Sequence, residues 1–107
     1  MELAFESLSL RATCESETQA RVELGEAVAE ILKHRLADMR AAASTRDLLV
    51  GKPRVDAGGH HMIIDVGDSY RIVFKANHVK CPMTENNEVD WARVNRIKIL
   101  RIESNNA

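Results

Sequence analysis

The most constraining feature of the sequence is a pair of alternating apolar runs on either side of a short polar turn. In residues 62–66 and again in 70–75, large apolar side chains recur at every second position. The three residues between the runs, Gly67-Asp68-Ser69, are of the types that form tight turns. This pattern predicts an antiparallel β-hairpin, so the chain must contain a sheet that is at least partly antiparallel.

A long stretch before the hairpin has the periodicity of an amphipathic helix. Residues 16–43 contain no proline and one glycine, and apolar side chains recur there at three- and four-residue spacing: Ala20, Leu24, Val28, Ile31, Leu32, Leu36 and Met39. Ser16 followed by Gln19 has the form of a capping box and predicts the helix start. Gly25 leaves open a division of this segment into two helices.

The remaining segments predict shorter elements around these two. We expect a first strand of about four residues within 3–10, a short second helix at 44–49, a helical turn at 90–93 and a last strand at 94–102. In that strand Ile97 and Ile99 should face one way, with Arg96, Lys98 and Leu100 facing the other. The later strands have no helices between them, which excludes a doubly wound parallel sheet.

The predicted fold class is therefore α+β, with an antiparallel sheet of four or five strands packed against the long helix and the short second helix. Much of its core should come from apolar residues of these elements: Leu24, Val28, Leu32, Ile64, Ile72, Phe74, Ile97 and Ile99. At 107 residues, 45% of them hydrophobic, the chain suits one domain spanning 1–107.

Charge and cysteine usage narrow the functional classes. Fifteen Lys and Arg oppose sixteen Asp and Glu, so any site for a polyanion must be a local patch. Cys14 and Cys81 form no disulfide framework and suit a reducing compartment. No apolar run approaches the roughly 20 residues that span a bilayer, and the start does not read as a signal peptide, so we expect a cytoplasmic protein.

Several catalytic and cofactor classes find no support. The chain has no G-x-S-x-G, P-loop or dinucleotide glycine pattern, and no His lies near Cys14 in the sequence. His78 and Cys81 have the chemistry of zinc ligands, but one His-x-x-Cys lacks the paired spacing of metal sites. We therefore expect neither a metal nor a cofactor.

Two stretches resemble one protein family. The stretches DVGDSYRIVFKA and EVDWARVNRIKILRIE, in their positions after a long helix, are similar to the RelE/ParE superfamily, and most to the HigB-type toxins often called killer or killer-suppression proteins. The resemblance covers nearly the whole chain. Its most specific parts are Tyr70-Arg71 at the start of the returning hairpin strand and Asp90-Trp91 ahead of the last strand.

The resemblance implies a toxin of a bacterial toxin–antitoxin pair that cleaves messenger RNA on the ribosome without a metal. The RNA 2′-hydroxyl attacks the adjacent phosphate, which requires a base, cations around the phosphate and an acid for the leaving oxygen. The implied partners are mRNA, the ribosome, a cognate antitoxin of helix-turn-helix type and, through the antitoxin, operator DNA. The antitoxin should cover the basic surface of the sheet.

The resemblance also assigns site residues. Arg71 carries over as the cation that stabilises the phosphate, while His60 and His61 are candidates to give or take a proton. Contacts to the RNA backbone are assigned by position and charge to Lys52, Arg54, Lys75, Arg96 and Lys98.

The same residues can also be interpreted as ordinary structural or surface residues. On the residues alone, Arg71 is more typical of a salt-bridging residue on a half-buried strand, and two histidines after two glycines are ordinarily exposed loop residues. For Arg71, the resemblance to the family favours the functional role over the salt-bridging role. Arg96 and Lys98 are more typical of a solvated strand face.

Two alternative functions remain open. One is a toxin-fold binding module that grips its antitoxin and cuts nothing. It is favoured by the short segment GKPRVDAGGHH and by the ending ESNNA, which lacks the Tyr or His usual in relatives. The other is ParE-like inhibition of DNA gyrase, which uses the same fold without RNA chemistry.

Overall fold

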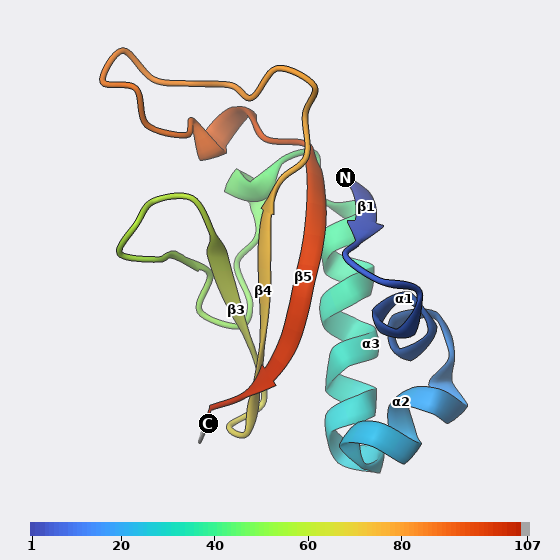
Figure 1. Cartoon of the computed structure of the whole chain (residues 1–107). Helices are drawn as coiled ribbons and strands as arrows, with labels where there is room; N and C mark the ends of the chain where they lie inside the picture. The colour runs from blue at the N-terminus through green and yellow to red at the C-terminus, as the bar shows by residue number, and fades with distance from the viewer. Residues whose placement is uncertain (106–107) are drawn as a thin grey trace.

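The computed structural model describes residues 1–105 as an α+β fold in which three helices pack against one side of a five-stranded sheet (Figure 1). In chain order its elements are β1 (Glu2–Phe5), α1 (Leu8–Glu15), α2 (Glu17–Leu24), α3 (Glu26–Ala41), η1 (Thr45–Asp47), β2 (Arg54–Val55), β3 (Met62–Val66), β4 (Tyr70–Ala76), η2 (Trp91–Arg93) and β5 (Arg96–Ser104). None of the helices in residues 1–105 combines the length and the apolar character needed to cross a bilayer.

The sheet is mixed, which corrects the expectation of a purely antiparallel sheet. Its strand order is β1-β5-β4-β3-β2, and β1 pairs in parallel with β5 while every other pair is antiparallel. A hairpin turn forces its two strands to run in opposite directions, but β1 is followed by three helices. Its direction is therefore set by how it docks on β5, and this long-range pairing leaves no local signal in the sequence.

The central hairpin is confirmed. Met62 pairs with Phe74 and Val66 with Tyr70, so the turn falls at residues 67–69 as predicted. Gly67 in this turn has φ +64°, a conformation that glycine adopts without strain.

The long helix is divided in two, and a further helix precedes it. Gly25 has φ +86° and separates α2 from α3, which is the division that the sequence left open. The Ser16 side chain accepts a hydrogen bond from the backbone N–H of Gln19 and caps α2 as predicted. The expected first strand of about four residues is confirmed as Glu2–Phe5. The helix α1, which was not predicted from the sequence, begins after Ser7, whose side chain caps it by accepting the N–H of Leu10.

The core lies between the sheet and α3. Of the eight predicted core residues, six are buried: Leu32, Ile64, Ile72, Phe74, Ile97 and Ile99. Leu24 and Val28 are only partly buried, because they lie near the α2–α3 junction at the margin of the core. Leu36 and Met39 continue the buried face of α3 toward its C-terminal end.

The two predicted short helical segments are 3₁₀ turns that pack on each other at one end of the sheet. The backbone N–H of Thr45 in η1 donates to the carbonyl of Val94, and the Thr45 hydroxyl donates to the carbonyl of Trp91 in η2. The Trp91 ring meets Phe74 edge-on, with centroids 6.3 Å apart and planes at 88°. Trp91 thus anchors η2 to the core.

A β-bulge interrupts the pairing of β5 with β4. Phe74 pairs with Ile99 but Val73 pairs with Arg101, so Leu100 is an extra residue in β5. The bulge reverses the alternation of side chains along β5. Beyond it, Ile102 lies opposite the core residue Ile72.

Candidate functional site

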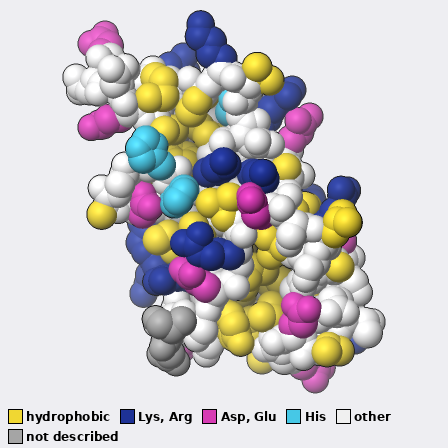
Figure 2. Space-filling model, in the orientation of Figure 1, with side chains coloured by type: hydrophobic (Ala, Val, Ile, Leu, Met, Phe, Trp, Pro, Cys, Tyr) yellow, Lys and Arg dark blue, Asp and Glu magenta, His cyan; other side chains and the backbone are white. Residues whose placement is uncertain are grey.

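The side of the sheet that faces away from the helices carries most of the charged candidates, and we call it the open face. Because Ile64, Ile72, Phe74, Ile97 and Ile99 point to the helices, their neighbours along the strands point to the open face. In Figure 2, histidine side chains lie beside several Lys and Arg side chains, with acidic side chains between them. The register arranges the open-face side chains in three rows across the strands.

The first row is cationic. Lys75 pairs with Lys98, and His61, which precedes the pair Met62–Phe74, lies level with Lys75 on the neighbouring strand. Lys98 forms an ion pair with Glu6 at 3.2 Å. Lys75 is exposed and has no ion pair or hydrogen bond of its side chain to any of residues 1–105.

His61 is held by a carboxylate. Its Nδ1 lies 3.3 Å from Oδ2 of Asp56, and the His61 backbone N–H donates to Oδ1 of the same side chain at 3.3 Å. The loop is fixed further because the Trp91 indole N–H donates to the carbonyl of Gly59 at 3.3 Å. The Asp56 carboxylate thus lies beside Nδ1, while Nε2 has no hydrogen-bond or ion-pair partner within residues 1–105.

The second row has an apolar centre. Ile63 pairs with both Arg54 and Val73, and Val73 pairs with Arg101, so two arginines flank two apolar side chains. Arg54 donates to Oδ1 of Asp65 at 3.0 Å.

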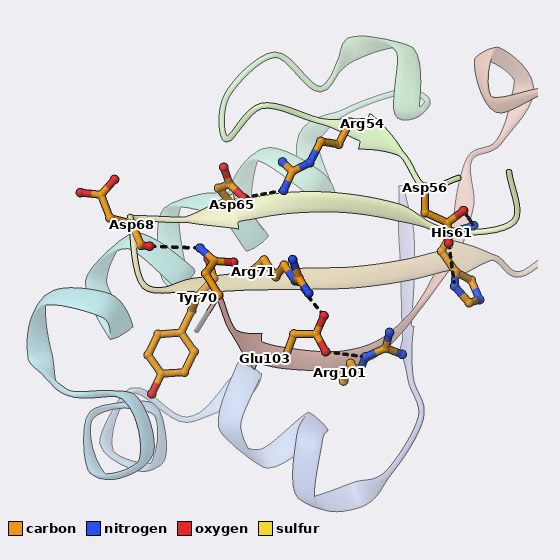
Figure 3. A network of polar contacts seen from close by, with 10 residues as sticks. Arg54, Asp56, His61, Asp65, Asp68, Tyr70, Arg71, Arg101 and Glu103 are labelled. Atoms are coloured by element: carbon orange, nitrogen blue, oxygen red, sulfur yellow. Dashed lines mark hydrogen bonds and ion pairs between the residues drawn. The ribbon is translucent and has the colours of Figure 1, made fainter. Parts of the chain in front are cut away.

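The third row places Arg71 between two carboxylates. Arg71 pairs with Asp65 on one side and with Glu103 on the other. Its Nε donates to Oε1 of Glu103 at 2.7 Å, while Nε of Arg101 donates to Oε2 at 2.9 Å. Figure 3 shows these three side chains together, with the Arg54–Asp65 pair beside them and the Asp56–His61 pair at the other end of the strands.

The two arginines change the acidity of the carboxylate that they share. Hydrogen bonds from Arg101, and then from Arg71, hold the pKa of Glu103 below its ordinary value. Glu103 is therefore ionised at neutral pH and offsets one of the two positive charges of the guanidinium groups that it contacts.

The candidate residues thus fall into separate groups. His61, Lys75 and Lys98 lie together, while Arg71 lies four residues along β4 from Lys75, or roughly 13 Å at about 3.3 Å per residue. Between these two groups lies Val73, which is buried although it faces away from the helices.

The other candidates lie at the margins. Arg96 pairs with Glu2 at the β1 edge, with its Nε 3.4 Å from Oε2. Lys52 is exposed just before β2, at the opposite edge of the sheet, and His60 is exposed in its loop. Neither the Lys52 nor the His60 side chain has a polar partner within the described residues.

Four residues of this face were not predicted as site residues: Asp56, Asp65, Arg101 and Glu103. Asp56 follows a short strand and precedes two glycines, so a turn carboxylate near His61 was a usable signal. Arg101 and Glu103 gave no such signal, because uninterrupted alternation from Ile97 and Ile99 places both of them on the core side. Of the chain's ending ESNNA, the last two residues lie outside the described residues.

The helix side offers a cavity rather than a charged surface. A space of about 360 Å³ lies between α1, α2 and α3 and is lined in part by Cys14, Ala29 and Leu36. Burial raises the pKa of the Cys14 thiol to about 11, so it carries almost no thiolate at neutral pH and is a poor nucleophile. Within residues 1–105, no group of three His, Cys, Asp or Glu side chains is placed to hold a metal ion.

Comparison with known proteins identifies no relative of this chain. Neither the protein-family models, nor the curated proteins, nor the solved structures gave a match to the chain.

Proposed function

We propose that the protein is the toxin of a toxin–antitoxin pair and has the RelE-like fold of the HigB type. In this proposal it acts as a metal-independent endoribonuclease on ribosome-bound mRNA. The observation that carries the proposal is the first row of the open face, where a carboxylate-oriented histidine lies level with Lys75, a cation without an anionic partner within residues 1–105. A base beside a cation is what phosphodiester cleavage requires.

The proposed reaction uses residues of the first and third rows. Nε2 of His61 takes the proton of the 2′-hydroxyl, the 2′-oxygen forms a bond to the adjacent phosphorus, and the bond from phosphorus to the 5′-oxygen breaks. The products are a 2′,3′-cyclic phosphate and a 5′-hydroxyl, whose proton comes from the ammonium group of Lys75. Arg71 stabilises the charge on the phosphate, which would lie between the first and third rows.

The test is cleavage of ribosome-bound mRNA in the presence of EDTA. We expect Arg71→Ala to lower the cleavage rate by about 10²-fold or more, the scale of losing one preorganised electrostatic partner, and His61→Ala to lower it less. Matched controls come from the helix side: Arg11, paired with Glu15 on α1, and His34, paired with Glu30 on α3. Arg11→Ala and His34→Ala should cleave as the wild type does.

Two results would overturn this chemistry. Unchanged cleavage by a folded Arg71→Ala variant would remove Arg71 from the mechanism, and a requirement for added metal would replace the mechanism altogether. Co-expression with the protein encoded by the neighbouring gene is the test of the antitoxin. If that protein neither binds nor relieves toxicity, the toxin–antitoxin assignment fails.

One observation favours the non-catalytic alternative, a toxin-fold module that binds its antitoxin. Most cations of the open face already have an anionic partner, in the pairs Arg54–Asp65, Arg71–Glu103, Arg101–Glu103, Lys98–Glu6 and Arg96–Glu2. Since phosphate contacts dominate RNA affinity, a neutralised face binds RNA weakly. Antitoxin binding without any cleavage by the wild type would support this alternative, whereas inhibition of gyrase would point to a ParE-like function.

A further inference from the structure

The unusual feature of the open face is a single carboxylate shared by two arginines from adjacent strands. Glu103 accepts from Nε of Arg71 through one oxygen and from Nε of Arg101 through the other, at 2.7 and 2.9 Å. Both guanidinium groups therefore converge on one point above the sheet, between β4 and β5 (Figure 3).

The donors at this point suit a phosphate as well as a carboxylate. Guanidinium groups bind both anions through the same planar arrangement of N–H donors. Two such groups directed at one position can satisfy two oxygens of a phosphodiester. Glu103 supplies two oxygens at that position from within the protein.

The arrangement depends on the bulge in β5. If β5 continued its regular alternation through Leu100, Arg101 and Glu103 would lie on the same side as Ile97 and Ile99 and would point to the core. The backbone irregularity thus brings both an arginine and its competing carboxylate to the face that holds Arg71.

The carboxylate is also positioned to leave. Its side chain is 26% exposed and the Arg101 side chain is 51% exposed, so no part of the fold seals the group. Ion pairs with this exposure typically contribute about 1 kcal/mol or less, and an incoming anion can exchange with them at little cost. Glu103 lies one residue from the end of β5, where little else depends on its side chain.

We infer that Arg71 and Arg101 form an anion subsite, that Glu103 occupies it in the free protein, and that a phosphodiester of the RNA substrate takes its place on binding. The inference rests on the proposed function, since it takes RNA as the ligand. Glu103 then acts as an internal competitor that weakens RNA binding.

The test compares Glu103→Gln with a matched variant on the helix side. Glu17 also bridges two cations, Arg21 at 3.2 Å and Lys33 at 2.8 Å, so Glu17→Gln makes the same change of charge in the same kind of ion pair away from the open face. The probe is a short single-stranded RNA with 2′-O-methyl groups, which cannot be cleaved. Its binding is measured by fluorescence anisotropy at several salt concentrations.

We expect Glu103→Gln to bind the probe about three- to fivefold more tightly than the wild type, as relief of one exposed ion pair allows. The dependence of log K on log salt should steepen, because in the wild type the displaced Glu103 carboxylate takes up a salt cation and offsets part of the counterion release. Adding Arg101→Gln should remove the gain. A gain shared by Glu17→Gln, or one that survives Arg101→Gln, would overturn the inference.

A second measurement separates this inference from the proposed function. Inorganic phosphate is titrated into Glu103→Gln while the Nε–H resonances of Arg71 and Arg101 are followed by NMR, with Glu103→Ala as a substitute if the first variant does not fold. Saturable shifts of both resonances in a protein that cleaves no RNA would keep the subsite and reject the nuclease. Absence of shifts in an active nuclease would reject the subsite alone.

Discussion

Gly51 is constrained by its backbone conformation and by its packing, and its sequence context indicates only part of this. The segment Gly51-Lys52-Pro53 predicts the end of a helical turn, and η1 does end shortly before it. The structure adds that Gly51 has φ +87° and packs against β3, where its carbonyl accepts the N–H of Asp65 at 2.7 Å. Both the backbone conformation and the close packing require glycine here.

Replacing Gly51 with Ala should therefore destabilise the protein by about 1–3 kcal/mol or more. An added Cβ would lie 2.6 Å from Cγ2 of Ile64 and 2.8 Å from the backbone oxygen of Asp65. The free energy of unfolding in urea is the measurement, and Gly58→Ala is the control, since its Cβ would meet nothing closer than 3.8 Å. Equal losses in both variants would show that steric conflict is not the cause.

Site residues were predictable where local pattern decides their position. Arg71 lies on the open face because the hairpin alternates regularly, and the same alternation places Lys75 on that face. The ion pair of Arg71 with Glu103 joins residues 32 positions apart. Glu103 could not be predicted as the partner of Arg71. Which side of the sheet the residues at the end of β5 face depends on a bulge that forms only in the assembled sheet.

At the scale of elements, the sequence predicts best those whose ends are marked by local chemistry. The hairpin has its turn residues, and α2 has the Ser16 cap. The helix α1 was missed because Leu8 and Leu10 alternate as in a strand, although Ser7 provides a cap of the same kind. The parallel pairing of β1 with β5 was missed for a different reason, because it joins segments from opposite ends of the sequence.

The cap of α2 gives a prediction at this scale. Ser16→Ala should lower the free energy of unfolding by about 1 kcal/mol, because the N–H of Gln19 loses its hydrogen-bond acceptor, now 3.2 Å away. Thermal unfolding measures the effect. Ser16→Asp restores an acceptor and should recover most of the loss, whereas a Ser16→Asp variant no more stable than Ser16→Ala would argue against capping.

For the whole molecule, Trp91 links segments that are far apart in the chain. Its indole N–H binds the loop of residues 56–61, its ring packs on Phe74, and its carbonyl accepts from Thr45. The loop that holds His61 is thus positioned by a residue 32 positions beyond Gly59. Precise placement of the candidate base therefore depends on the folding of a much later part of the chain.

Trp91→Phe keeps an aromatic ring against Phe74 but removes the donor to Gly59. We expect a loss of about 1 kcal/mol in stability and faster amide hydrogen exchange in residues 56–61, with α3 unchanged. Tyr70→Phe removes a polar group from an aromatic side chain at the other end of β4 and serves as the control. Loop exchange that is no faster in Trp91→Phe than in Tyr70→Phe would disprove the anchoring role.

The bulge at Leu100 has a consequence for how sequences of this kind are compared. A relative without the extra residue would continue the ladder regularly from Ile99, and its equivalents of Arg101 and Glu103 would still reach the open face. In a relative of the same length whose β5 pairs with β4 without a bulge, the residues equivalent to Arg101 and Glu103 would point to the core. Conservation of Arg101 should therefore be judged by its spacing from Ile102, on its own side of the bulge, and not by its spacing from Ile97.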